Sequence, residues 1–337
     1  PSIISEFSGL KSLNLSRCNM QHLPKSLVEL TALEDLSLQN NRFSTFPEFI
    51  GEMENLSAIN LTQNPYEQFP EFLARLPKLT SFVLDFGRME GAAGLEKCQQ
   101  FRTLHLSQSR EFELPDELFE LRKLQTLHIF RKEMGPEPRF LRLGDLVDLK
   151  IVCPSEVVWS EAWDSLPALE VLELRGNTFE GKMPNWGKMK ALQRLSLKGE
   201  MADLPNLEPA ESALRVLSIS NSRSTQFPES YGLFPKLEEL KLSNANFGEF
   251  PTTVLQLEGL RTLRFRNCGI KSLPSEISQL TNLKTLDLSR NPLREVPVSL
   301  FHMVHLETLQ LDNTHLPLEQ VFALRNALPY TQVNMRK

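Results

Sequence analysis

Apolar residues recur along this chain with a fixed period of 22 or 23 residues. Each unit opens with the phrase Leu-x-x-Leu-x-Leu, whose alternating apolar residues predict a short β-strand with one buried face. No single unit can bury that face alone, so the period predicts a solenoid of stacked units. With the first leucine of the phrase counted as place 1, fourteen units begin at Leu10, Leu33, Leu56, Leu79, Phe101, Leu124, Leu146, Leu169, Leu192, Leu214, Leu237, Leu260, Leu283 and Leu306.

The residues after each strand also keep fixed places. Place 9 often carries an asparagine, such as Asn41, Asn64, Asn177 or Asn291, whose side chain can satisfy the backbone of the turn. Place 15 is a proline in many units, and apolar residues follow at places 18 and 21. These features predict an irregular or 3₁₀ return segment that packs inward. The proline places are Pro24, Pro47, Pro70, Pro115, Pro228, Pro251, Pro274 and Pro297.

This phrase resembles the leucine-rich repeat of the 23-residue class in which Leu-Pro follows each strand, found in intracellular scaffolds and bacterial effectors. The resemblance covers residues 10–316. It implies a single curved α/β solenoid, a leucine-rich-repeat horseshoe with a parallel inner β-sheet and about fourteen repeats of 22–23 residues. The segment from Asn177 to Pro184 is similar to the plant-receptor variant N-x-L-x-G-x-I-P.

The two ends of the chain depart from the repeat. We expect residues 1–9 to be a partial N-terminal cap or the truncated flank of a longer chain. Residues 317–337 are expected to form a C-terminal cap, with a helix from Pro317 to Leu328 and a closing strand from Thr331 to Met335. The solenoid itself is expected to occupy residues 10–316.

Composition narrows the possible functions. Hydrophobic residues make up 41% of the 337 residues, enough for a folded protein. The chain has no run of eighteen apolar residues and no signal-peptide pattern, so we expect no membrane span. A net charge of −5 disfavours a dedicated nucleic-acid binder. Motifs for metalloproteases, hydrolases, dinucleotides and phosphate loops are absent, so we expect no enzyme activity and no cofactor.

The four cysteines indicate the cellular compartment through their ability or inability to form disulfides. They lie three or more repeats apart, which at about 4.8 Å per strand exceeds the reach of a disulfide. We therefore expect free thiols and an intracellular location, either cytoplasmic or, for a secreted bacterial effector, in the host cytoplasm. Cys18, Cys98 and Cys268 are expected to be buried. The sequons that begin at Asn14, Asn55 and Asn60 point the other way.

Places 3, 5, 7 and 8 of each repeat are expected to face solvent on the concave side of the sheet. Most are polar, but repeats 4 to 7 carry an aromatic and β-branched cluster there, and mixed charges follow in repeats 8 and 9. Large exposed apolar patches tend to be contact sites. The alternative is that a neighbouring loop covers them. The predicted partner-binding residues are Phe86, His105, His128, Phe130, Arg131, Lys150, Val152, Glu173, Arg175 and Lys198.

A second set of cations forms a basic stripe across repeats 11 to 13. This stripe suits an acidic patch on a partner, and an ordinary solvated face is the alternative. Its members are Lys241, Arg264, Arg266 and Arg290.

Three further features have simpler explanations. His105 and His128 occupy the same place on adjacent strands, but two ligands do not make a zinc site, even with Asp85 or Cys153 nearby, so we expect no metal. Trp159, Trp163 and Trp186, like Tyr66 and Tyr231, fall at inward places and are expected in the core.

Repeats 4, 6, 7, 8 and 9 lose the place-15 proline. Such departures from a local rule often mark a functional region. The sequence therefore predicts a non-catalytic module, monomeric in isolation, that binds a protein on its concave face around repeats 4 to 9. The alternatives are the substrate-recruiting domain of a larger enzyme, such as an effector ubiquitin ligase, and an extracellular receptor ectodomain.

Overall fold

Proline starts most of the return segments. In the computed structural model, Pro24 precedes a 3₁₀ helix with φ of −70°, and its carbonyl accepts a hydrogen bond of 3.1 Å from the Leu27 amide. Pro274 does the same for Ile277 at 3.2 Å, with φ of −69°. Proline suits this place because its ring fixes φ and it has no N–H group to leave unpaired. The predicted 3₁₀ returns are therefore present.

The structure describes residues 4–85, 89, 91–107, 113–132, 135, 137–209 and 211–336. Clustering of its contacts divides the chain into unit 1 (Pro1–Pro154) and unit 2 (Ser155–Lys337), which are described separately below.

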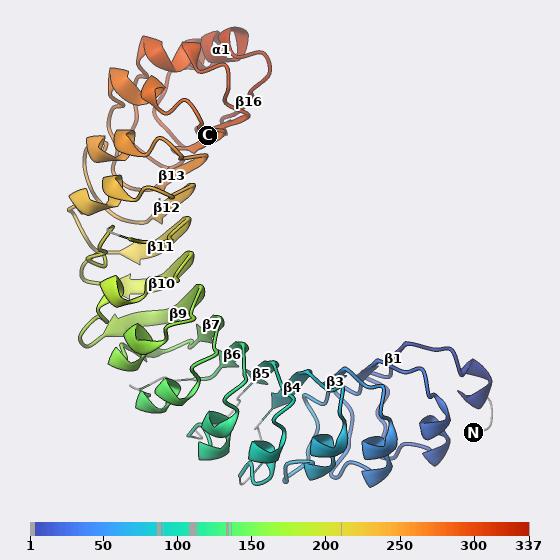
Figure 1. Ribbon diagram of the computed structural model, residues 1–337. Coiled ribbons are helices and arrows are strands. Elements are labelled where there is room, and N and C mark those ends of the chain that lie inside the picture. Colours follow the sequence, from blue (N-terminus) through green and yellow to red (C-terminus); the bar gives the residue numbers. More distant parts are fainter. Residues whose placement is uncertain are drawn as a thin grey trace. The chain divides into compact units, whose positions relative to one another are not determined.

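Unit 1 contains seven parallel strands in the part that the structure describes, and they pair in the order of the chain (Figure 1). The first three strands are three residues long and the next four are five residues long. They are β1 (Ser12–Asn14), β2 (Asp35–Ser37), β3 (Ala58–Asn60), β4 (Ser81–Asp85), β5 (Thr103–Ser107), β6 (Thr126–Phe130) and β7 (Asp148–Val152).

Unit 2 continues with parallel strands paired in the order of the chain, from β9 to β16. The short strand β8 pairs only with the second half of β9, at Thr178–Glu180. The strands are β8 (Glu156–Val158), β9 (Val171–Glu180), β10 (Arg194–Met201), β11 (Val216–Ser222), β12 (Glu239–Ser243), β13 (Thr262–Arg266), β14 (Thr285–Asp287), β15 (Thr308–Gln310) and β16 (Gln332–Asn334).

Within each unit the strands line one side and the 3₁₀ helices line the other (Figure 1). We call the surface that carries places 3, 5 and 7 the sheet face. The 3₁₀ helices are η1 (Ile4–Phe7), η2 (Lys25–Glu29), η3 (Glu48–Glu52), η4 (Glu71–Arg75), η5 (Leu95–Lys97), η6 (Asp116–Glu120), η7 (Pro138–Arg142), η8 (Glu161–Ser165), η9 (Trp186–Lys188), η10 (Glu229–Leu233), η11 (Thr252–Gln256), η12 (Ser275–Gln279) and η13 (Val298–His302).

Other residues replace proline where the repeat is irregular. Gly94 precedes η5 with φ of +95°, a conformation that glycine adopts without a side-chain clash. Glu137 caps η7 by accepting a hydrogen bond from the Arg139 amide, and Asn185 caps η9 in the same way through Gly187. A capping side chain thus takes over where the Leu-Pro phrase is lost.

The core consists of the inward leucines and the aromatic residues of the returns. Trp163 and Tyr231 are fully buried, and Trp159, Trp186 and Tyr66 are nearly so. The prediction that these residues belong to the core is confirmed. The prediction for the cysteines is partly wrong, because Cys98 and Cys268 are buried but Cys18 is exposed. Cys18 belongs to the first repeat, where the strand pairs on one side only among the described residues.

The end of unit 2 follows the predicted pattern. Helix α1 spans Leu318–Ala327 and buries Val321 and Leu324. Strand β16 then pairs with β15, so that Val333 lies beside Leu309. The cap thus adds a helix and a final strand to the same sheet.

Candidate functional site

The register of unit 1 brings the predicted residues of β4 to β7 together on its sheet face. His105 pairs with His128, and His128 pairs with Lys150 on the next strand. A second row, one step toward the carboxyl ends of the strands, contains Ser107, Phe130 and Val152. Strand alternation points both rows away from the core, because the residues that alternate with them along β6, Leu127 and Ile129, are buried.

The two histidines form a stacked pair. Their ring centroids lie 4.4 Å apart with an interplanar angle of 15°. The Nε2 atom of His128 is 3.5 Å from a carboxylate oxygen of Asp148 on β7. Sequence reasoning did not include Asp148, although its place on the strand beside His128 was readable from the repeat.

Burial lowers the pKa of His105 below its ordinary value, and the adjacent His128 and Lys150 lower it further, while Asp148 opposes the shift. At neutral pH His105 is therefore an uncharged ring in the middle of the sheet face. Such a ring can stack against an aromatic group or exchange a hydrogen bond without the cost of removing a charge from water.

Phe130 is the most exposed of the described aromatic residues in the predicted cluster. Its side chain is 48% exposed, although it ends a strand whose other apolar side chains are buried. Val152 beside it is partly buried. Phe86, which was predicted to extend this patch, lies outside the described residues. The described patch therefore consists of the histidine pair, Phe130 and Val152, bordered by basic side chains.

The basic residues of the cluster already have interactions. Arg131 and Lys150 each take part in a contact within the chain. Neither is a free cation in the unbound protein, and a partner would have to share or replace these contacts.

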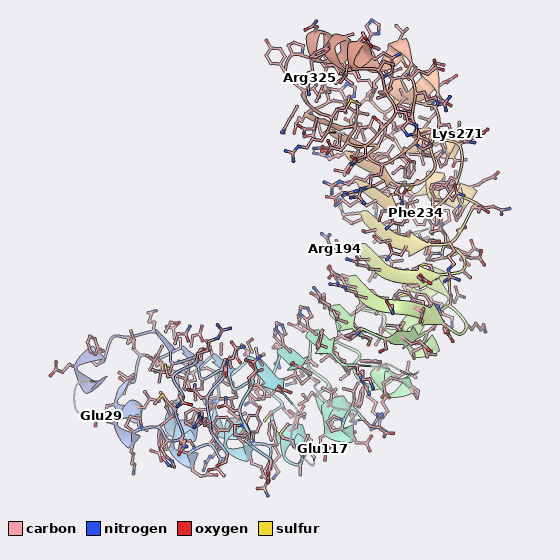
Figure 2. The ribbon with its side chains drawn as sticks, turned by 180° about the vertical axis from the view of Figure 1, so that it is seen from behind. Glu29, Glu117, Arg194, Phe234, Lys271 and Arg325 are labelled. Carbon is pink, nitrogen blue, oxygen red and sulfur yellow. The ribbon has the colours of Figure 1, made fainter. Side chains whose placement is uncertain are left out.

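On the sheet face of unit 2, cations lie side by side. Arg175 on β9 is in register with Lys198 on β10, and both are exposed. Arg194, at the start of β10, lies on the strand side of the unit (Figure 2). None of these three cations forms an ion pair with a residue that the structure describes, whereas Glu173 on the same face has an interaction of its own.

The predicted basic stripe is present but partly neutralised. Lys241 pairs in register with Arg264, and Arg266 lies two residues further along β13. Lys241 also forms an ion pair with Glu239 of its own strand. Arg290 follows β14 in the left-handed region, with φ of +62°. Arg264, Arg266 and Arg290 thus carry most of the uncompensated positive charge of this stripe.

The sequence analysis missed a ladder of side-chain amides beside the basic stripe. The Nδ2 atom of Asn244 donates to Asn221 at 2.6 Å, and that of Asn267 donates to Asn244 at 2.9 Å. All three residues occupy place 8 with positive φ, a conformation that asparagine tolerates better than most residues. The recurrence of asparagine at place 8 of successive repeats is the sequence feature from which this ladder could have been predicted.

The described residues offer no group of three or more His, Cys, Asp or Glu side chains placed to hold a metal ion. Cys153, imagined as a ligand for the histidine pair, is fully buried, and burial raises the pKa of its thiol to about 11. In the part of the chain with assigned structure, no helix has the length and apolar content to span a bilayer.

Comparison with known proteins identifies others with a similar sequence segment or a similar fold. A family model for leucine-rich repeats matches residues 258–316. A leucine-rich-repeat protein of Leptospira interrogans has a TM-score of 0.71 at 21% identity, covering 99% of this chain and 98% of that one. The chain therefore has the leucine-rich-repeat fold, and residues 258–316 match the family model itself. No curated protein matches this chain in sequence.

Two structures of complexes are also similar. A chain of the Drosophila Toll–Spätzle complex has a TM-score of 0.70 at 20% identity, with 97% of this chain and 47% of that chain covered. The plant peptide hormone receptor RGFR1, in complex with RGF2, has a TM-score of 0.54 at 21% identity, with coverages of 97% and 55%. This chain therefore spans about half the length of those two chains. At such identities the likeness establishes the fold.

Proposed function

We propose that this leucine-rich-repeat protein is a non-catalytic recognition module that binds another protein through the sheet face of unit 1. The contact is centred on Phe130 and the stacked pair of His105 and His128, with Val152 at its edge. Arg131 and Lys150 supply polar contacts at the border. Phe86 belongs to the proposed surface through its place in the sequence.

The exposure of Phe130 carries this proposal. A phenylalanine that is 48% exposed on a sheet face of mostly polar places leaves apolar area in water. Binding energy at protein interfaces is concentrated in a few aromatic and arginine side chains near the centre of the contact. The neutral His105 ring and Val152 extend the same surface, so a partner can bury a continuous patch rather than one side chain.

The structural relatives support recognition as the role of this fold. The Toll structure is a complex with Spätzle, and the RGFR1 structure is a complex with RGF2. The Leptospira interrogans relative, which matches nearly the whole chain, makes a bacterial origin part of the proposal. That comparison and the repeat class support a role as an effector or scaffold as part of the proposal.

Within unit 2, we propose that Arg175 and Lys198 contact acidic groups of a protein partner, with Glu173 among the cations as a discriminating negative charge. Arg264, Arg266 and Arg290 form a second basic contact. Exposed cations without acid partners raise the rate of encounter with an acidic surface more than they raise affinity.

An intracellular location is also part of the proposal. All four cysteines are unpaired, and three of them are buried. Proteins of oxidising compartments more often carry disulfides. A receptor ectodomain is the second candidate, favoured by the likeness to a chain of the Toll–Spätzle complex. Asn55 begins one of the sequons of this chain, and its amide nitrogen donates a hydrogen bond to the carbonyl of Thr31 at 2.6 Å.

Replacing Phe130 by alanine is expected to weaken partner binding at least tenfold and to leave folding unchanged. The side chain is half exposed, so its loss creates no cavity in the core, but it removes the centre of the proposed contact. The partner is first captured by cross-linking in a cell lysate and then purified. Its affinity for each variant is measured by isothermal titration calorimetry.

Phe322→Ala is the matched control. Phe322 is 58% exposed, but it lies on α1 and outside both sheet faces. The control is expected to bind within twofold of the unmodified protein. Equal affinities of the Phe130→Ala and Phe322→Ala variants would contradict the proposal.

A further inference from the structure

A groove runs along unit 2 beside the turns that follow β9, β10 and β11. Its first part is a hollow of about 760 Å³ lined by residues between Trp159 and Glu208, and its second part is a hollow of about 600 Å³ that extends to Glu229. The two hollows share Asp203, Leu204 and Asn206. The lining therefore comes from four successive repeats, three of which contribute the turns after β9, β10 and β11.

The floor of the first hollow is apolar. Trp159 stacks on Phe179 with ring centroids 4.8 Å apart, and Trp186 meets Trp159 edge to face at 5.9 Å. Met183 and Leu204 complete this part of the lining. Such a floor can bury the methylene groups of a long side chain, whose charged end stays at the rim.

The rim is acidic. Glu180, Asp203, Glu208 and Glu229 line the groove, and all four are exposed. None of them forms an ion pair with a described residue, and no lysine or arginine is among the residues that line either hollow. Four like charges in a concave surface create a negative potential that attracts cations.

Cations near the groove in sequence are engaged elsewhere. Lys188 pairs with Asp164 at 3.4 Å, and Arg223 pairs with Glu200. Lys182 also has an interaction of its own. The acidic charge of the rim is therefore not compensated by these neighbouring side chains.

A hollow in unit 1 provides an internal comparison. It has a similar volume of about 800 Å³ and also contains glutamates. There, however, Glu48 pairs with Arg75, and Glu71 pairs with Lys97 at 2.8 Å, and both cations line the same hollow. Two of the three glutamates of that hollow are thus paired and only Glu67 has no ion pair with a described residue, whereas all four carboxylates of the unit 2 groove have none.

Trp186 adds a second observation. It is 7% exposed and lines the groove, and its indole N–H has no hydrogen-bond partner in the described part of the chain. A buried donor without an acceptor costs free energy and calls for an explanation. The nitrogen atom is itself enclosed, so a small rotation of the indole ring would bring the N–H to the groove, where a carbonyl oxygen of a seated segment would supply the missing acceptor.

We propose that this groove binds an extended basic segment of a partner protein, with lysine or arginine side chains directed to Asp203 and Glu208. Three repeats at about 4.8 Å per strand accommodate about three to four residues of extended chain. The side-chain stems lie on the floor formed by Trp159, Phe179 and Leu204. The surface is separate from the two sheet faces and does not depend on the function proposed for them.

The probe is a fluorescein-labelled peptide of sequence Gly-Lys-Leu-Arg-Ala-Lys, titrated with the full chain by fluorescence anisotropy. Its neutral analogue carries acetyl-lysine and citrulline in place of the basic residues. The basic peptide is expected to bind at least tenfold more tightly than the analogue. Equal binding of the two peptides would overturn the proposal.

A double variant, Asp203→Asn with Glu208→Gln, is expected to weaken binding of the basic peptide at least tenfold. Glu249→Gln with Glu258→Gln is the matched control, because it removes the same charge from exposed residues of unit 2 that do not line the groove. The control is expected to bind within twofold of the unmodified protein. An equal loss in both double variants would mean a general electrostatic attraction and would overturn the proposal.

Two measurements complete the test. Trp186→Phe keeps an aromatic ring but removes the N–H group, and it is expected to weaken binding of the basic peptide about threefold. Unchanged affinity would contradict the proposed contact to the indole N–H. Sedimentation velocity without peptide is expected to give one monomeric species. Self-association that Asp203→Asn with Glu208→Gln abolishes would identify a second copy of the chain as the occupant and overturn the proposal.

Discussion

Replacing Asn291 by alanine is expected to lower the free energy of unfolding by about 3–5 kcal/mol. Asn291 is 1% exposed, and its Oδ1 atom accepts hydrogen bonds from the amides of Cys268 and Ile270 at 2.9 and 3.0 Å. Its Nδ2 atom donates to the carbonyl of Leu288 at 2.8 Å. Alanine would leave these backbone groups buried and unpaired, and each such group costs about 1–3 kcal/mol.

Urea unfolding monitored by circular dichroism measures the loss. Hydrogen exchange at Cys268 and Ile270 locates it, because those two amides lose their acceptor. The control is Asn282→Ala, which removes a single exposed hydrogen bond to Glu258 and is expected to change stability by less than about 1 kcal/mol. An Asn291→Ala variant as stable as the control would contradict the role given to the buried asparagine. The basic stripe would also be affected, because Arg290 adjoins Asn291 and Arg266 ends the neighbouring strand β13, two residues before Cys268, whose amide donates to Asn291.

Replacing Gly232 by alanine is expected to lower the free energy of unfolding by about 3 kcal/mol. A methyl group at Gly232 would lie 2.2 Å from the backbone oxygen of Thr253, which begins the return of the next repeat. Backbone atoms cannot rotate aside as a flexible side chain can. The return segments η10 and η11 would therefore have to separate, although both pack into the same core.

Gly259→Ala is the matched control for this variant. At Gly259 the nearest atom to a new methyl group is the Leu237 oxygen at 3.6 Å, an ordinary contact. Thermal unfolding of the two variants is compared by differential scanning calorimetry. Equal melting temperatures would show that the returns are not packed as closely as Gly232 and Thr253 indicate.

The repeat could be predicted from the sequence because its signals are local. Proline fixes φ at the start of a return wherever it occurs, as Pro24 and Pro274 show, and alternating leucines define one buried face of each strand. The same grid placed Trp159 and Trp186 inward and put His105 beside His128. The fixed backbone geometry of the repeat is sufficient to predict which side chains are buried and which lie on adjacent strands.

Features that depend on side-chain packing were not predictable in the same way. The repeat grid assigned Cys18 to a buried place, but its strand pairs on one side only among the described residues, and Cys18 is exposed. The groove of unit 2 involves turns from three repeats, and its signal was only the loss of proline in repeats 7 to 9. Neither the stacking of Trp159 on Phe179 nor the unpaired state of Asp203 can be read from spacing.

Contact of a protein partner with the sheet face of unit 1 is the central proposal for this molecule. Hydroxyl-radical footprinting of the captured complex by mass spectrometry tests it most directly, since the method reports the solvent exposure of individual aromatic side chains. The oxidation rate of Phe130 is expected to fall at least fivefold on binding, while Phe322 and Tyr330, which is 92% exposed, keep the rates of the free protein. An unchanged rate at Phe130 together with protection of Phe322 or Tyr330 would contradict the claim.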